Sequence, residues 1–367
     1  MARAVMHGVY TKAAKPILFQ FSPDTVHAKT VTLGAWAQRQ SAIRWLLRHT
    51  LAYDDPMLSQ EVCGVHFANP VGLSAGFDKK VKLIPLMESL GFGFETCGSV
   101  TSKVCEGNPK PWFKRIPEHK SLAVHVGLAN PGSEAIKRSL RHDKLIAHRH
   151  MPLIMSVART NSRQASSDAD GIQDYVASIV RLRPYPEMFE INISCPNTYG
   201  GEPFTDPARL DALLSAIDDI GLDQPVFIKM PSNVAWPQYD RLLGVIVKHN
   251  VQGVTVCNLH KDRTGLNIDD SVKGGLSGGP IQERSDELIR RTYKKYGDRL
   301  VIIGVGGIFS AEDAYRKITY GATMVALITG MIYEGPQLAG AINAGLKRLC
   351  RQDGFDNISQ AIGSRVK

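Results

Sequence analysis

Cysteine and histidine are sparse in this chain, and neither occurs in a metal-binding pattern. No CxxC pair is present, and the eleven histidines form no HExxH motif. We therefore predict no metal site. Because the cysteines lack paired spacings, we also expect free thiols in a reducing compartment. The cysteines are Cys63, Cys97, Cys105, Cys195, Cys257 and Cys350.

Long apolar runs are missing as well. No stretch of about 18 apolar residues occurs, so the sequence predicts no membrane-spanning helix. The first 20 residues lack a long apolar core and an A-x-A cleavage site, which argues against a secretory signal. The 367 residues are 43% hydrophobic and 22% charged, a composition that is ordinary for a globular enzyme.

Acidic residues are in the minority. The chain has 35 Asp and Glu residues against 44 Lys and Arg residues, which gives a formal net charge of +9. Such an excess attracts nucleic acids or anionic membrane surfaces. We find no nucleic-acid motif and no dense basic run interleaved with aromatics, so we predict no nucleic-acid partner. The charge alone also fits a soluble protein with a mildly basic surface.

Residues 1–52 differ from the rest of the chain. Ser22 and Pro23 are typical of a helix start, and one helix or two should follow to about His49. Apolar and basic positions mix there in a pattern suited to the surface layer of a bilayer, although a helix pair packed on the rest of the protein is the alternative. The apolar positions are Leu33, Trp36, Ile43, Leu46 and Leu47, and the basic ones are Lys29, Arg39, Arg44, Arg48 and His49.

From residue 72 onward, short apolar runs alternate with amphipathic ones. Eight strands, most of them followed by a helix, predict an α/β fold, the (β/α)8 TIM barrel. Residues 103–126 contain prolines and alternating residues in place of a helix, which predicts a small β insertion above the barrel. The expected strands are 71–77, 94–100, 153–158, 189–194, 225–230, 253–257, 300–305 and 324–328. The expected helices are 80–90, 172–183, 207–220, 238–249, 281–296, 311–320 and 336–350.

Two late strand exits are rich in glycine. Barrel enzymes carry their chemistry at the carboxyl ends of the strands, so the exits are candidate site positions. Gly304-Val-Gly-Gly307 precedes a possible helix cap at Ser310, and Thr329-Gly330 closes the last strand. Backbone N–H groups at such exits bind phosphate. A tight turn that needs glycine only for its backbone conformation is the alternative, and we favour the phosphate site.

Lysines and asparagines follow other strands. Lys79 and Lys229 end apolar runs, where a buried ammonium group needs an anionic ligand or a neighbouring carboxylate such as Asp78. Asparagines at two further exits suit a ligand with amide or carboxylate groups, although each could also serve a turn. These asparagines are Asn192, Asn197 and Asn258.

The most informative segment is Met188-Phe-Glu-Ile-Asn-Ile-Ser-Cys-Pro-Asn-Thr198, a strand that breaks at Pro196. Cys195 lies at that break, where a core thiol has no need to be. A thiol has an ordinary pKa of about 8.5 and deprotonates near neutrality when a cation or a helix dipole helps. We therefore predict that Cys195 carries proton transfer or nucleophilic chemistry, with an inert buried cysteine as the alternative.

Together these motifs resemble the dihydroorotate dehydrogenases, FMN-dependent (β/α)8 enzymes of pyrimidine biosynthesis. The N-terminal extension is similar to that of the membrane-associated, quinone-dependent class 2, whose helices form an apolar tunnel from the bilayer to the flavin. The resemblance runs from about residue 19 to about residue 341. Its carriers are Phe19…Asp24…His27, Gly72-Leu-Ser-Ala-Gly-Phe-Asp-Lys79, Gly91-Phe-Gly93, Asn192-Ile-Ser-Cys-Pro-Asn-Thr198, Gly274-Gly-Leu-Ser-Gly-Gly-Pro280 and Ile303-Gly-Val-Gly-Gly-Ile308.

The resemblance implies roles for individual residues. Cys195 would be the catalytic base that takes a proton from the substrate, which also passes a hydride to FMN, and a quinone would then receive the electrons. The substrate, dihydroorotate or an analogue, would be bound by Lys79, Asn192, Asn197 and Asn258. FMN would be held by Ala75, Gly76, Ser99, Ser156, Asn192, Lys229, Gly278, Gly307 and Thr329, the phosphate by Gly307 and Thr329.

The resemblance also divides the chain. Residues 1–52 would form a helical extension for membrane contact and quinone access, and residues 53–367 the FMN-binding barrel. The protein would then be peripheral, at the cytoplasmic side of a membrane.

Several positions depart from class 2. Cys195 stands where that class has serine, and Val124 and Leu259 replace a substrate-binding asparagine and a threonine. Three hypotheses follow, in order of preference. The first is a quinone-linked dihydroorotate dehydrogenase. The second is an FMN paralogue that acts on another cyclic or conjugated carbonyl compound. The third is a non-catalytic peripheral flavin-binding protein.

Overall fold

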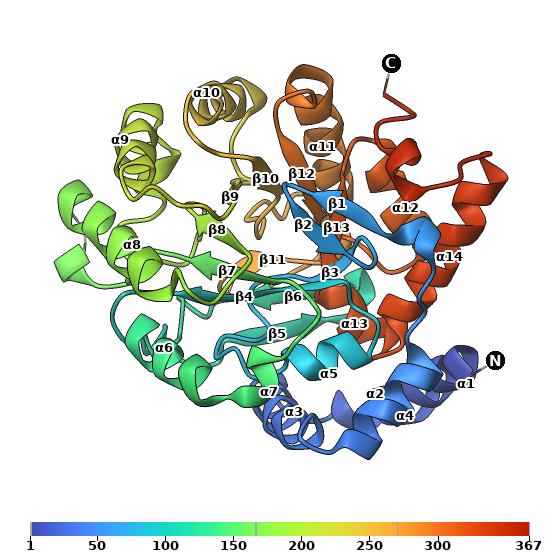
Figure 1. The fold of residues 1–367 in the computed structure, drawn as a ribbon. Coiled ribbons are helices and arrows are strands. Elements are labelled where there is room, and N and C mark those ends of the chain that lie inside the picture. Colours follow the sequence, from blue (N-terminus) through green and yellow to red (C-terminus); the bar gives the residue numbers. More distant parts are fainter. Residues whose placement is uncertain (1, 166, 270, 367) are drawn as a thin grey trace.

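Eight parallel strands close into a barrel in the computed structural model, which describes residues 2–165, 167–269 and 271–366 (Figure 1). Barrel neighbours follow the chain order, and the last strand pairs with the first, with Val325 beside Val71. The predicted TIM barrel is confirmed. Its strands are β3 (Val71–Leu73), β4 (Phe94–Val100), β7 (Leu153–Val157), β8 (Met188–Asn192), β9 (Val226–Lys229), β10 (Gly253–Val256), β12 (Val301–Val305) and β13 (Met324–Leu327).

Helices surround the strands, and the amphipathic runs of the sequence explain their positions (Figure 1). In α8, for example, Ser167 caps the helix by accepting a hydrogen bond from the N–H of Asp170, and Tyr175 and Ile179 are buried on the inner face. The barrel helices are α5 (Ile84–Ser89), α6 (Ser133–His142), α7 (Lys144–Ala147), α8 (Asp168–Leu182), α9 (Pro207–Asp218), α10 (Trp236–Ile246), α11 (Gln282–Tyr296), α12 (Ala311–Thr319), α13 (Thr329–Glu334) and α14 (Leu338–Gln352).

One predicted helix begins later than expected. Residues 80–83 precede α5 instead of forming its first turn. The buried carboxylate of Asp78 accepts hydrogen bonds from the backbone N–H groups of Lys80 at 3.1 Å, Lys82 at 2.5 Å and Leu83 at 2.7 Å. These bonds hold residues 80–83 in a turn around the carboxylate, so the helix starts only at Ile84.

A hairpin packs against the apolar interior of the barrel. It consists of β1 (Gln60–Val62) and β2 (Val65–Phe67), which pair antiparallel. Phe67 inserts its ring edge-on against Phe94 of β4, with the centroids 5.7 Å apart. Ile154, Met188, Phe227 and Met324 belong to the same cluster. The chemistry of the barrel is therefore left to the carboxyl ends of its strands.

The predicted β insertion is also confirmed. β5 (Phe113–Ile116) and β6 (Ser121–Val124) form an antiparallel pair, which β11 (Gly275–Leu276) extends to three strands. β11 comes from the segment between β10 and α11, far along the chain. The small sheet thus joins the insertion to the late strand exits.

The N-terminal helices lie against α5, α13 and the small sheet, at the bottom and lower right of Figure 1. They are α1 (Ala2–Val9), the π-helical turn η1 (Tyr10–Ala14), α2 (Lys15–Leu18), α3 (Pro23–Ala37) and α4 (Ser41–Leu51). The expected cap at Ser22 is wrong, because its side chain makes no capping hydrogen bond. Asp24 in the first turn instead accepts the backbone N–H of Trp112 at 3.1 Å, which ties α3 to the insertion. The functional division at residue 52 stays a prediction.

Across the described part of the chain, none of the helices has the length and apolar character needed to cross a bilayer.

Candidate active site

A cavity of about 550 Å³ connects the N-terminal helices with the carboxyl ends of the barrel strands. Its N-terminal part is mainly apolar, with Leu18, Phe19, Val26 and Leu33 in its wall. The barrel end is lined by twelve of the thirteen predicted site residues: Ala75, Gly76, Lys79, Ser99, Asn192, Cys195, Asn197, Lys229, Asn258, Gly278, Gly307 and Thr329. The fold therefore brings together positions that are scattered over more than 250 residues of sequence.

Ser156 is the exception, since it lies behind the cavity wall. Its hydroxyl is fully buried and 2.8 Å from the hydroxyl of Ser99. The amide of Asn192 donates to the same Ser99 hydroxyl at 2.9 Å. Ser156 thus holds Ser99 in place, and Ser99 presents the polar group to the cavity.

A second set of hydrogen bonds joins the asparagines of two neighbouring exits. The Asn258 amide donates to Asn192 Oδ1 at 3.2 Å and to the backbone oxygen of Ser194 at 2.7 Å. The Ser194 hydroxyl in turn donates to the backbone oxygen of Lys229 at 2.7 Å. These bonds fix two amide groups side by side on the wall.

Lys229 is almost completely buried at the end of β9. Its ammonium nitrogen lies 3.8 Å from Glu190 Oε1 on the adjacent strand β8. That carboxylate oxygen has no hydrogen-bond partner in the described structure. The pair thus places a buried positive charge in the cavity wall, with its counter-charge on the neighbouring strand.

Lys79 points its ammonium group into the turn that follows β3. It donates to the backbone oxygen of Gly76 at 2.6 Å and lies 5.3 Å from the ring centroid of Phe113. Burial lowers the pKa of Lys79 to about 8, although Asp78 and Asp24 act in the opposite direction. Because Asp78 is engaged by backbone N–H groups, the ammonium group remains available to an anionic ligand.

Cys195 faces the cavity in the segment that follows β8. Burial raises the pKa of its thiol to about 11, and the Glu202 carboxylate adds to this rise. A hydrogen bond from the backbone N–H of Asn197 and the charge of Lys229 act in the opposite direction without balancing it. The surroundings therefore favour the protonated thiol, and the proposed role of Cys195 stays a prediction.

Two departures from the class 2 pattern lie in the same cavity wall. Val124 on β6 and Leu259 after β10 both line the cavity. The backbone oxygen of Val124 accepts the Asn197 amide at 2.8 Å, so its position in the wall is fixed while its side chain offers no polar group. These two side chains make this part of the cavity less polar than an asparagine and a threonine would.

Two polar residues near the site were not predicted. The hydroxyl of Ser277 lies 2.8 Å from that of Thr329, beside the glycines of the late exits. Asn108 donates to the backbone oxygen of Asn197 at 3.1 Å from the far side of the insertion. Ser277 belongs to the glycine-rich 274–280 motif and could have been found there. Asn108 gives no sequence signal, because only the folding of the insertion brings it near Asn197.

The sequence analysis also missed a buried cluster of three side chains, two of which lie on β4. One side-chain atom each of Asp78, Glu95 and Cys97 lies within 4.8 Å of the others. Asp78 already accepts hydrogen bonds from the backbone, and burial raises the pKa of Glu95 well above its usual range. The raised pKa of Glu95 works against the carboxylate form that a cation needs. The prediction that the protein binds no metal stays a prediction.

Comparison with known proteins places this architecture in one family. Residues 57–350 match the family model described as dihydroorotate dehydrogenase. A "Dihydroorotate dehydrogenase (quinone)" of Gloeobacter violaceus is 34% identical over 353 residues, which cover 96% of this chain and 98% of the relative. A protein of the same description from Anaeromyxobacter dehalogenans (strain 2CP-C) is 35% identical over 358 residues, 96% of each chain.

Solved structures agree with these sequence matches. The crystal structure of DHODH from Eimeria tenella in complex with ferulenol has a TM-score of 0.83 and 25% sequence identity, and the likeness covers 95% of this chain and 98% of that one. Because the family match spans most of the barrel and the relatives align over nearly their whole length, the chain belongs to the dihydroorotate dehydrogenase family of oxidoreductases.

Proposed function

We propose that this protein oxidises dihydroorotate to orotate, with FMN as cofactor and a quinone as electron acceptor. The observation that carries the proposal is a continuous cavity, which has a polar end at the barrel strands and an apolar end at the N-terminal helices. The names of the similar proteins, dihydroorotate dehydrogenase (quinone), support both the substrate and the acceptor.

The residues at the barrel end fit FMN. Gly278 has φ +76°, and a Cβ there would lie 2.2 Å from the backbone oxygen of Lys120 and 2.8 Å from a methyl carbon of Thr329. Gly307 has φ +69° and is equally crowded, against Gln282. Both positions thus require glycine, for the positive φ and for close packing within the wall, and the backbone N–H groups of these turns would bind the phosphate. Ser277 and Thr329 would add hydroxyl groups at this end.

The ring end of the cofactor would meet other groups. Ser99 and Asn192 would hydrogen-bond the flavin ring, and Lys229 would offset the negative charge of the reduced form. When bound, FMN would supply the two-electron acceptor for a hydride from the substrate and pass the electrons on to quinone.

Substrate would be held against this ring by Lys79 and by the Asn192, Asn197 and Asn258 amides. Lys79 carries the positive charge that a substrate carboxylate needs, and amides match the ring carbonyl and N–H groups of dihydroorotate. Cys195 would take the proton from the carbon beside a carbonyl. Its raised pKa means that the thiolate form is scarce at neutral pH, so the charges around the thiol would control the rate of proton transfer.

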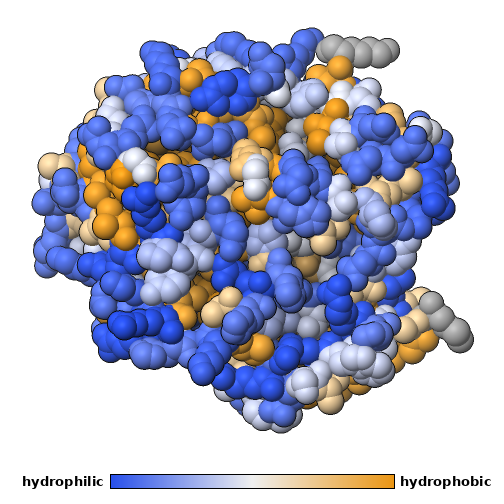
Figure 2. All heavy atoms as spheres, viewed as in Figure 1, coloured by the Kyte–Doolittle hydropathy of each residue, from blue (hydrophilic) through white to orange (hydrophobic). Residues whose placement is uncertain are grey.

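The N-terminal helices would bring quinone and membrane to the other end of the cavity. Hydrophobic residues lie on the surface of this region, beside the N-terminus at the lower right of Figure 2. Trp36 is 56% exposed and Trp45 is 62% exposed, and Phe21, Leu33 and Leu46 are also exposed. Exposed aromatic and aliphatic side chains among lysines and arginines suit a peripheral contact with the bilayer surface. We place this contact at the cytoplasmic side.

A second candidate function keeps the flavin and changes the substrate. Val124 and Leu259 favour it, because an apolar side chain opposite a polar ring leaves ligand groups without partners. The substrate would then be another cyclic or conjugated carbonyl compound with fewer hydrogen-bonding groups.

One experiment separates these possibilities. The purified protein should show a flavin absorbance spectrum, and anaerobic addition of dihydroorotate should bleach it within a stopped-flow trace. A flavin that stays oxidised at millimolar dihydroorotate would rule out the first function, and its reduction by another dihydropyrimidine or by an enone's saturated analogue would support the second. A flavoprotein that none of these compounds reduces would have neither activity.

A further inference from the structure

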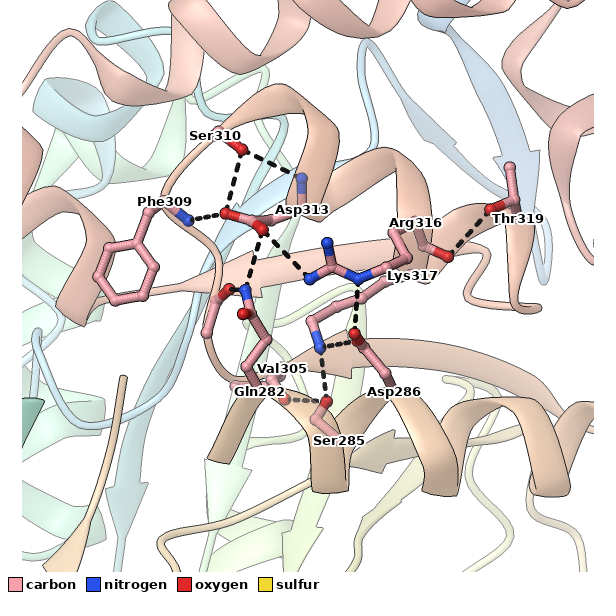
Figure 3. A network of polar contacts seen from close by, with 11 residues as sticks. Gln282, Ser285, Asp286, Val305, Phe309, Ser310, Asp313, Arg316, Lys317 and Thr319 are labelled. Carbon is pink, nitrogen blue, oxygen red and sulfur yellow. Dashed lines mark hydrogen bonds and ion pairs between the residues drawn. The ribbon is translucent and has the colours of Figure 1, made fainter. Parts of the chain in front are cut away.

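A network of charged side chains lies directly behind the glycine-rich turn that follows β12 (Figure 3). At its centre, the ammonium group of Lys317 on α12 is completely buried. It lies 2.6 Å from Asp286 Oδ1 and donates to the hydroxyl of Ser285 at 2.8 Å, both on α11. Arg316 binds the other oxygen of Asp286 at 2.6 Å. A cation at complete burial needs such partners, because an unpaired one is strongly destabilising.

This network reaches the backbone of the turn through its side chains. The Ser285 hydroxyl donates to the backbone oxygen of Val305 at 2.6 Å, and the Gln282 amide donates to that of Gly307. Asp313 accepts the backbone N–H of Phe309 at 3.0 Å. Hydrogen bonds from side chains of α11 and α12 therefore fix the 305–309 segment at three positions.

The charged groups are also connected to one another. Asp313 Oδ1 accepts from Gln282 at 2.9 Å and from Arg316 at 3.1 Å, so it links both helices to the turn. Two cations, Arg316 and Lys317, face two carboxylates, Asp286 and Asp313. The carbon chain of Lys317 packs behind Gly304, where an added Cβ would lie 3.4 Å from its Cδ. The arrangement balances its formal charges and is hydrogen-bonded throughout, with Lys317 fully buried and Arg316 partly exposed, which favours one geometry over several.

The opposite side of the same turn lines the cavity. Val305, Gly306, Gly307 and Ile308 are in its wall, whereas Lys317 is not. Lys317 cannot reach a ligand there, but the Ser285 bridge joins it to the backbone that would. Movement of the Val305 carbonyl would reorient the peptide groups that follow it, at Gly306 and Gly307.

We propose that Lys317 is a positioning residue for the phosphate end of the cofactor, acting through Ser285 on the backbone of the 305–307 turn. The inference rests on the proposed FMN site and adds a residue that never touches the cofactor. It predicts a selective effect: loss of Lys317 weakens binding of the phosphate while the binding of the isoalloxazine ring is left intact.

Riboflavin, which lacks the phosphate, provides the test. Full-length protein stripped of flavin is titrated with FMN and with riboflavin, and quenching of flavin fluorescence gives both dissociation constants. In Lys317→Met the dissociation constant for FMN should rise at least about tenfold, which matches the loss of well-oriented bonds to a charged group. The constant for riboflavin should stay close to that of the unchanged protein.

Two further variants keep the test decisive. Lys295→Met removes a lysine from the same helix as Ser285, where it pairs with Asp240 on the surface, and should change neither constant. Ser285→Ala removes only the bridge to Val305 and should reproduce the FMN-selective loss in part, and it decides the question if Lys317→Met does not fold. Equal loss of both flavins, or no loss of either, would overturn the inference. Failure of the unchanged protein to bind FMN would instead overturn the proposed function.

Discussion

If Cys195 is the catalytic base, it has to accept a proton although its surroundings favour the protonated thiol. Burial and the Glu202 carboxylate raise its pKa to about 11. Lys229 and the backbone N–H of Asn197 lower the pKa but offset only part of this rise. A base with a high pKa is strong but scarce: it binds the proton tightly once it is ionised, and few molecules are ionised at neutral pH. The pH dependence of the first half-reaction should therefore report on this residue.

We expect the rate constant of flavin reduction by saturating dihydroorotate to rise steadily between pH 6 and pH 10, because the thiolate fraction increases towards the pKa of about 11. Cys195→Ala should lower the rate at least about 100-fold, the usual contribution of a general base. Anaerobic stopped-flow absorbance measures both. A rate that is independent of pH over this range, or an active alanine variant, would remove Cys195 from the proton transfer.

Lys79 should cause a second pH dependence: the affinity for product should fall as the pH rises, whereas the rate of flavin reduction should increase. Burial lowers its pKa to about 8, so its charge is present below that pH and is lost above it. Affinity for the product carboxylate should be constant from pH 6 to about 7.5 and should then fall as the pH rises through 8. Titration of the flavin absorbance with orotate measures this affinity.

Removal of the charge is the control for that titration. Lys79→Met should bind orotate weakly at every pH and should show no decline above pH 8. If the decline persists in the variant, a group other than Lys79 causes it.

At the scale of elements, α3 and α4 carry the membrane assignment, which depends on exposed rather than buried side chains. Trp36→Ser together with Trp45→Ser should reduce co-sedimentation with anionic phospholipid vesicles several-fold, because both rings are more than half exposed and would bury apolar area in the bilayer surface. Val180→Ser on α8 is the matched control, since Val180 is 54% exposed on another part of the surface. Equal vesicle binding by all three proteins would contradict the assignment.

The strands of the barrel were predictable, and the reason is physical. Strands that are buried on both faces form continuous apolar runs, and the run 94–100 became β4 with its predicted bounds. Three of the barrel helices, α6, α7 and α13, were not predicted. α6 is short and strongly polar on one face, and α13 begins at Thr329, which the sequence places at a strand exit. Local pattern does not reveal where such short segments turn into helices.

The candidate site was predictable to the same extent as the strands. Residues at strand exits, such as Asn192 and Lys229, follow from barrel geometry once the strands are known. Asn108 and Lys317 could not be predicted, because their roles depend on packing between segments far apart in the chain. The raised pKa of Cys195 could not be read from the sequence for the same reason, since burial is a property of the folded barrel and not of the segment around it.

In the whole molecule, one cavity has a polar wall at one end and an apolar wall at the other. The polar end lies among the strand exits, and the apolar end lies among α3, α4 and their neighbours. If substrate and quinone meet the flavin from these two ends, each half-reaction depends on residues that the other does not use. Deleting the N-terminal helices is a blunt way to separate them, because Leu51 of α4 is buried and Gly340 of α14 packs against its backbone. A deletion would therefore expose the barrel surface as well as removing the tunnel.

Filling the apolar end with a single side chain separates the half-reactions more cleanly. Thr30 on α3 lines the cavity but remains exposed, so Thr30→Trp should narrow the tunnel without disturbing the core. Reoxidation of the reduced flavin by a short-chain quinone should slow at least about tenfold, since a tryptophan occupies the apolar volume that the quinone needs. Flavin reduction by dihydroorotate should keep its rate. Thr32→Trp, two residues along the same helix and outside the cavity wall, should leave both rates unchanged. Slowing of both half-reactions by Thr30→Trp would show that substrate and quinone share one route to the flavin.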